Sequence, residues 1–76
     1  MITTRKIDEI TFDLNTMFLK VDGKTISIPL ESVSKKLLMA DEVQRELYTI
    51  SPSGYGIHWP MIDEDLSIDF LIKSAQ

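Results

Sequence analysis

The chain has 76 residues, a net charge of −4 and no cysteine, which predicts one small domain (residues 1–76) without a disulfide or a thiolate metal site. No apolar run approaches the ~20 residues of a membrane helix, and residues 1–8 lack the apolar stretch of a signal peptide, so we expect a cytoplasmic protein. Residues 1–60 carry eight acids and seven bases (−1), whereas residues 61–76 carry four acids and one base (−3). Nucleic-acid binding needs clustered Lys and Arg, so this distribution predicts no direct nucleic-acid binding and favours a basic protein partner.

The first third of the chain alternates between apolar and polar residues, which is typical of strands with one buried face. The apolar positions of its first stretch are Ile10, Phe12 and Leu14. Two further stretches, Met17–Val21 and Thr25–Pro29, flank Asp22-Gly23, a dipeptide that suits a type I′ turn because both central residues need positive φ. This pattern predicts an antiparallel hairpin that ends at Pro29, because proline cannot donate a ladder hydrogen bond.

Residues 32–46 change to helical spacing. The first apolar residues at this spacing are Val33, Leu37 and Leu38. Asp41 is predicted to cap a second short helix, and Gln44, three residues on, to complete a capping box. We expect Val43 and Leu47 to face the core and the helix to end near Leu47.

The C-terminal third predicts a second hairpin and a last helix. Tyr48–Ile50 and Gly56–Trp59 are the expected strands, Pro60 ends the second one, and Gly54 and Gly56 are expected to serve the intervening turn with positive φ. Ser67 is the expected N-cap of a helix from Ile68 to about Lys73. The fold class is therefore α+β: a small antiparallel sheet of two hairpin-type units with two or three short helices packed on it.

His58, the one histidine of the chain, is a candidate catalytic residue. A general base or a metal ligand needs a suitable partner nearby, and alternation places Ile57 and Trp59 on one face and His58 on the other. A structural or surface role is favoured. An enzyme that uses His58 with Asp63 stays open as an alternative, and it requires a carboxylate within hydrogen-bond reach of His58 in a cleft.

The acid cluster Asp63, Glu64 and Asp65 has three interpretations, ranked as a solvated face, a contact surface for a basic partner, and a metal site. The metal site ranks last because the stretch lacks the Gly and the distant Glu of a calcium loop. Trp59 is expected in the core or at its rim, and if it is partly covered it becomes a contact residue. The sequence contains no nucleophile–base pair, metal cluster or cofactor loop, so we expect a non-catalytic protein without a cofactor.

Several blocks of the sequence resemble the bacterial and phage family called domain of unknown function 2442. The blocks are Asp22–Glu31, Ala40–Arg45, Gly54–Pro60, and Asp63–Ile68 with Leu71. The resemblance covers about residues 10 to 72, and the Gly-Ile-His-Trp-Pro block followed by the acidic-Leu-Ser block is its specific part. This chain departs from the family at Ser32-Val33-Ser34, where many members have aromatic residues and a proline.

The resemblance implies a small antiparallel sheet with flanking helices and no established catalytic residue. Family relatives fused to helix-turn-helix domains, or encoded beside a second small protein, imply sensing or partner binding, and the fold is also linked to phage inhibitors of CRISPR complexes. Our first expectation is a non-catalytic protein-binding module, antitoxin-like or a phage inhibitor of a defence complex, that acts as a monomer or an edge-strand homodimer. Its expected partner-binding residues are Tyr55, Trp59, Asp63, Glu64 and Asp65. The alternative is a stand-alone ligand-sensing regulatory domain, which requires an apolar pocket between the sheet and the helices.

Overall fold

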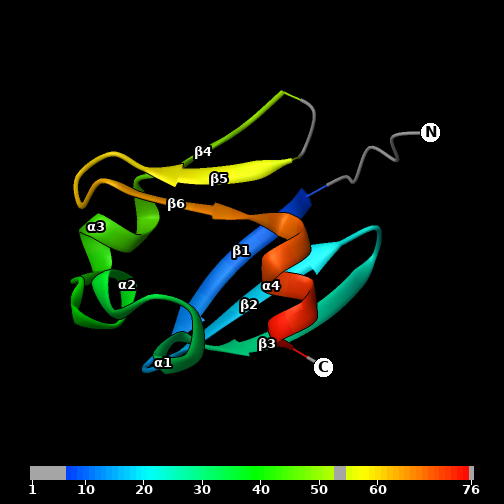
Figure 1. Ribbon diagram of the computed structural model, residues 1–76, viewed down its shortest axis with the longest axis horizontal. Coiled ribbons are helices and arrows are strands. Elements are labelled where there is room, and N and C mark those ends of the chain that lie inside the picture. The colour runs from blue at the N-terminus through cyan, green and yellow to red at the C-terminus, as the bar shows by residue number, and fades with distance from the viewer. Residues whose placement is uncertain (1–6, 53–54, 76) are drawn as a thin grey trace.

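The computed structural model describes residues 7–52 and 55–75, and these residues form two three-stranded antiparallel sheets and four short helices (Figure 1). The N-terminal sheet has the order β1-β2-β3 and the C-terminal sheet the order β4-β5-β6. The strands are β1 (Ile7–Asp13), β2 (Thr16–Val21), β3 (Lys24–Pro29), β4 (Thr49–Ile50), β5 (Gly56–Trp59) and β6 (Glu64–Ser67). The helices are α1 (Leu30–Val33), α2 (Lys35–Met39), α3 (Glu42–Glu46) and α4 (Ile68–Ser74). The predicted α+β class is confirmed.

The hairpin of β2 and β3 forms as predicted. Asp22 and Gly23 have φ values of 51° and 83°, the positive values that a type I′ turn requires. Val21 pairs with Lys24 beside this turn, and the ladder runs back to Thr16 and Pro29. Pro29 is the last residue of β3, as expected, and it is also the N-cap of α1.

The β1–β2 connection corrects one prediction. Leu14 was expected on the buried face, but it is 82% exposed and has a φ of 53°. The reason is that β1 ends at Asp13 and its partner on β2 is Thr16, which leaves Leu14 and Asn15 as a two-residue turn. Strand alternation no longer applies within a turn, so the apolar side chain of Leu14 points to solvent.

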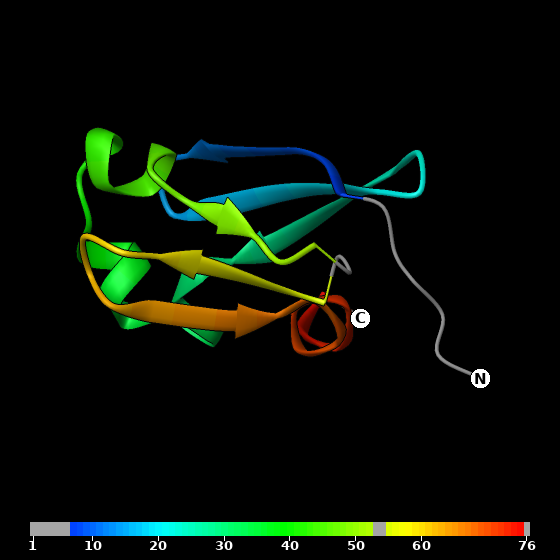
Figure 2. The same ribbon diagram turned by 90° about the horizontal axis from the view of Figure 1, so that it is seen from above.

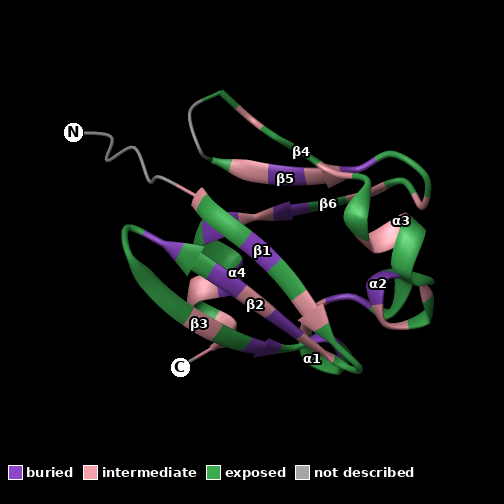
Figure 3. Ribbon diagram, turned by 180° about the vertical axis from the view of Figure 1, so that it is seen from behind, coloured by how far each residue is buried: buried purple, intermediate pink, exposed green. Residues whose placement is uncertain are grey.

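The core contains buried residues of both sheets. The C-terminal sheet lies above the N-terminal sheet in Figure 1 and passes in front of β3 when seen from above in Figure 2. Every second residue of β2 is buried, and β1 contributes the buried Ile10 (Figure 3), so one face of the N-terminal sheet is more covered than the other. Helix α4 packs against β3, α1 and β6 and covers part of the same face. The buried apolar side chains are Ile10, Met17, Leu19, Val21, Ile28, Leu30, Leu37, Ile57, Trp59, Leu66, Ile68 and Leu71.

The capping box of α3 is confirmed: Asp41 accepts from the backbone N–H of Gln44, and the Gln44 side chain accepts from the backbone N–H of Asp41. The expected orientation of this helix is wrong, because Val43 and Leu47 are 59% and 50% exposed. Helix α3 has no buried residue. It is held instead by the side chain of Arg45, which lies on its inward side and donates three hydrogen bonds to backbone carbonyls.

The C-terminal sheet contains a strand that the sequence interpretation missed. Residues 64–67 form β6, which pairs with β5 from Trp59–Glu64 to Gly56–Ser67. The predicted β5 and the Ser67 N-cap are confirmed, since Ser67 accepts from the N–H of Phe70 at the start of α4. Gly54 lies outside the described residues, and Gly56 does not have the positive φ expected of it. None of the helices within residues 7–52 and 55–75 is long and apolar enough to cross a membrane.

The turn of the first hairpin gives a test of the fold. A Cβ at Gly23 would meet no atom within 4 Å, so Gly23→Ala has only a conformational cost, and we expect a loss of about 1 kcal/mol in the free energy of unfolding. Gly56→Ala is the matched control, because the φ of Gly56 is not in the left-handed region and a Cβ added there would lie 3.4 Å from the Leu66 carbonyl oxygen, an ordinary van der Waals contact. Urea denaturation should show the loss for Gly23→Ala alone. An equal loss for both variants would contradict the turn assignment.

Candidate functional site

Trp59 belongs to the core and is not a surface contact. Its side chain is 0% exposed, its Nε1–H donates to the backbone carbonyl of Arg45 at 3.1 Å, and its ring centroid lies 6.3 Å from that of Tyr48 in a tilted arrangement. The expectation that Trp59 touches a partner is therefore corrected. The reason is the register of β5, which turns Ile57 and Trp59 to the inner face of the C-terminal sheet.

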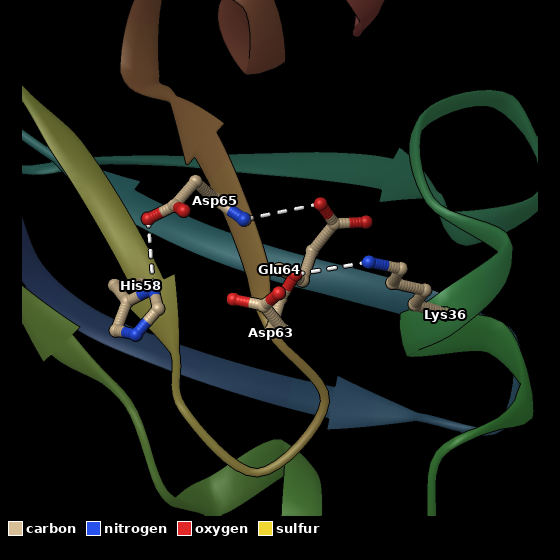
Figure 4. A network of polar contacts seen from close by, with 5 residues as sticks. All are labelled: Lys36, His58, Asp63, Glu64 and Asp65. Atoms are coloured by element: carbon tan, nitrogen blue, oxygen red, sulfur yellow. Dashed lines mark hydrogen bonds and ion pairs between the residues drawn. The ribbon is translucent and has the colours of Figure 1, made fainter.

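Glu64 is also engaged within the fold. One carboxylate oxygen accepts from the Ser34 hydroxyl at 2.6 Å, and the other accepts from the backbone N–H of Asp65 at 3.0 Å (Figure 4 shows the second contact). Ser34 is buried and caps α2 through the N–H of Leu37. Glu64 thus links the edge of β6 to the start of α2, and its negative charge is directed toward these donors instead of a partner.

Asp63 occupies the turn before β6. Its φ is 52°, a left-handed conformation that Asp and Asn adopt more readily than other non-glycine residues. The Lys36 ammonium donates to the Asp63 backbone carbonyl at 2.9 Å (Figure 4), while the Asp63 side chain is exposed. The three successive acids therefore have three different surroundings. The described residues contain no group of three or more His, Asp or Glu side chains placed to hold a metal ion.

His58 and Asp65 form a pair on the outer face of the C-terminal sheet, the face opposite Trp59. They are direct partners in the β5–β6 ladder, and His58 Nδ1 lies 2.8 Å from Asp65 Oδ1 (Figure 4). The side chains are 41% and 75% exposed. The enzyme alternative paired His58 with Asp63, but the structure brings Asp65 to it. The contact follows from register, because side chains directly opposite on an antiparallel pair lie close together.

The outer face also contains a hollow of about 690 Å³. Its lining residues include Thr49, Ile50, Ser51, Pro52, Tyr55, His58, Asp65 and Ser67. Tyr55 is 68% exposed, so most of this lining side chain is accessible to solvent. The Ser51 hydroxyl oxygen accepts from the backbone N–H groups of Tyr55 and Gly56 at 2.9 and 3.0 Å, which fixes the entry of β5. Of the expected partner-binding residues, only Tyr55 and Asp65 line this hollow.

The hollow can offer an aromatic ring, hydroxyls and one carboxylate–imidazole pair to a bound surface. Within the described part of the chain, Asp65 is the one hydrogen-bond partner of the His58 ring. No nucleophile is hydrogen-bonded to that ring there, so the relay that a nucleophilic mechanism requires is not assembled among these residues. The arrangement is suited to contact with a polar or basic surface.

Two structural residues were missed by the sequence interpretation. The first is Arg45, which donates to the backbone carbonyls of Leu37 (Nε, 3.0 Å), Leu14 (Nη1, 2.7 Å) and Leu38 (Nη2, 3.2 Å). The second is Ser34 at the junction of α1 and α2, whose hydroxyl donates to Glu64 and accepts from the N–H of Leu37. Ser34 carries a usable signal, because a serine just before an apolar helical stretch is a common N-cap. The partners of Arg45 are distant backbone carbonyls, for which the sequence has no pattern.

A family model described as Protein of unknown function (DUF2442) matches residues 7–76. No curated protein and no solved structure matches the chain. The family description names no activity, ligand or partner.

The different roles of the neighbouring acids can be tested by stability. Glu64→Gln replaces one acceptor oxygen with an amide that cannot accept from Ser34 or Asp65, so we expect a loss of about 1–2 kcal/mol in the free energy of unfolding. Asp63→Asn removes the same charge one residue earlier, and Asn suits a left-handed φ, so its effect should stay within about 0.5 kcal/mol. Urea denaturation compares the two variants. Equal losses would mean that Glu64 has no special structural role.

Proposed function

The chain belongs to the DUF2442 family of unknown function. We propose that it is a non-catalytic protein-binding module. It covers a basic surface of a larger partner with the outer face of its C-terminal sheet. The observation that carries this proposal is that Tyr55 and Asp65, both exposed, line the same hollow. Exposed aromatic rings are frequent anchors of protein interfaces.

The acid content of this face supports a basic partner. Asp65 is exposed, whereas the Glu64 carboxylate is satisfied inside the fold. The chain carries a net charge of −4, which steers a positively charged partner toward it over distances comparable to the Debye length. The charge of Asp65 then acts at close range, within the hollow that Tyr55 also lines.

The proposed biological settings are those that the family resemblance implies. In a bacterial setting the partner is a toxin, and the chain acts as an antitoxin-like cover. In a phage setting the partner is a CRISPR or other defence complex whose basic nucleic-acid-binding surface is masked. Both settings require the same chemistry, a basic protein surface that accepts an aromatic anchor.

Affinity capture from the host lysate at low and at high salt, followed by calorimetry on the purified pair, tests this proposal. We expect a stoichiometric partner whose binding weakens as salt rises. Tyr55→Ala should raise the Kd by about tenfold or more, because it removes an exposed aromatic anchor. Asp65→Asn should flatten the salt dependence.

Glu31→Gln is the matched control for Asp65→Asn, because it also removes one exposed negative charge but lies on α1, outside the hollow. Its Kd should remain close to that of the parent chain. A partner that binds Tyr55→Ala and Asp65→Asn as tightly as the parent chain would contradict the proposed surface, and the absence of a partner at either salt would contradict the proposed function.

The hollow favours a second candidate, a ligand-sensing regulatory domain. The sequence interpretation required an apolar pocket between the sheet and the helices, whereas this hollow lies on the outer face of the C-terminal sheet and is lined by β4, β5 and β6 together with residues 51, 52 and 55. A thermal-shift screen over a metabolite panel separates the two candidates. A ligand that raises the melting temperature of the parent chain but not that of Tyr55→Ala would support the sensing function. No shift in melting temperature across the panel would rule that function out.

A further inference from the structure

A second concave surface lies next to the start of β4, on the side away from the hollow of the outer face. It is a groove of about 600 Å³ between β1 and α3, and its lining residues are Ile10, Thr11, Phe12, Asp13, Leu14, Glu42, Arg45, Glu46 and Tyr48. Figure 3 places α3 near the end of β1. Tyr48 lines this groove and Thr49 lines the hollow of the outer face, so the two surfaces adjoin but share no lining residue.

One wall of the groove is the free edge of a strand. Within the described residues, β1 pairs with β2 alone. Asp13 and Thr16 flank a two-residue turn and pair with each other, so they exchange both ladder hydrogen bonds, and the bonding then alternates along the strand. By this alternation, Ile10 and Phe12 direct their backbone N–H and C=O groups away from β2. None of the hydrogen bonds in the described part of the chain outside the ladder involves these groups.

Both sides of the groove carry negative charge. Glu42 and Glu46 are exposed on α3, and Asp13 is exposed at the end of β1. Arg45 also lines the groove, but its guanidinium is engaged within the fold, since it binds three carbonyls and lies 5.4 Å from the centroid of the Phe12 ring. A ligand in the groove therefore meets three carboxylates at the rim and the apolar side chains of Phe12 and Tyr48.

From this arrangement we propose that the groove binds an extended, basic segment of a protein partner, which adds as a fourth strand to the free edge of β1. The outward N–H and C=O groups of Ile10 and Phe12 supply the main-chain pairing that strand addition requires. The three carboxylates select Lys and Arg in the segment. This inference concerns a site other than the outer face, and it stands or fails separately from the function proposed above.

A basic peptide fits the groove better than a second copy of the chain. In a β1–β1 dimer, the exposed acids Glu9 and Asp13 of one edge would lie close to the same acids of the other copy, and like charges opposed across strands are unfavourable. Nucleic acid is disfavoured by the same carboxylates. Strand addition by a Lys- or Arg-containing segment satisfies both the backbone edge and the charge.

Selection of random 12-residue peptides displayed on phage against the full chain tests the proposal. We expect the selected peptides to be rich in Lys and Arg, and synthetic copies to bind with a Kd that rises on the order of tenfold in the Glu42→Gln/Glu46→Gln variant. Hydrogen exchange by NMR should show new protection of the Ile10 and Phe12 amides upon peptide binding. Circular dichroism checks that the variant is folded.

Glu31→Gln/Asp63→Asn removes two exposed negative charges outside the groove and should leave the peptide Kd unchanged. Tyr55→Ala should also leave it unchanged, which separates this site from the outer face. A selection that yields no basic peptides, equal binding to the two double variants, or no protection at Ile10 and Phe12 would overturn the proposal. A concentration-dependent dimer by light scattering that the Glu42→Gln/Glu46→Gln variant alters would overturn it in favour of a second copy.

Discussion

The arrangement of the two sheets depends on Arg45. Its guanidinium binds the β1–β2 turn through Leu14 and the end of α2 through Leu37 and Leu38, while its own backbone carbonyl accepts from the buried indole of Trp59. One residue thus connects the N-terminal sheet, two helices and the C-terminal sheet. The described helices have four to seven residues, and helices this short depend on tertiary contacts for their stability. Arg45 supplies those contacts for α3, where apolar burial is absent.

The acidic C-terminal stretch has two roles that the sequence does not separate. The Glu64 carboxylate covers the Asp65 N–H, and it also binds the buried Ser34. Satisfying an edge N–H in this way makes the edge less available for pairing with another chain. Asp65, on the opposite face, remains exposed in its pair with His58. The β1 edge has no comparable cover among the described residues, and this difference is the reason to place strand addition at β1.

Local signals predicted the parts of the fold that have local causes. Asp22-Gly23, the Asp41–Gln44 capping box and the Ser67 N-cap each act over a few residues, and all three are confirmed. Strand β6 was missed because Glu and Asp are rare in strands, although the alternation of Glu64 and Leu66 with Asp65 and Ser67 is present in the sequence. The inward side of α3 was misassigned because a cation, not an apolar stripe, faces the core there. Of the five expected site residues, only Tyr55 and Asp65 line the hollow. The register of β5 buries Trp59, and Glu64 is engaged by Ser34 and by the Asp65 N–H, while the same register brings His58 to Asp65.

We propose that this chain acts by binding a protein partner with the outer face of its C-terminal sheet. Titration of the isotope-labelled chain with its purified partner, followed by NMR of the backbone amides, shows which face binds. We expect that the amides of Tyr55, His58 and Asp65 change most, and that those of Thr25 and Ser27 on β3 stay unchanged. Changes confined to β2, β3 and α4, with the outer face unaffected, would contradict it.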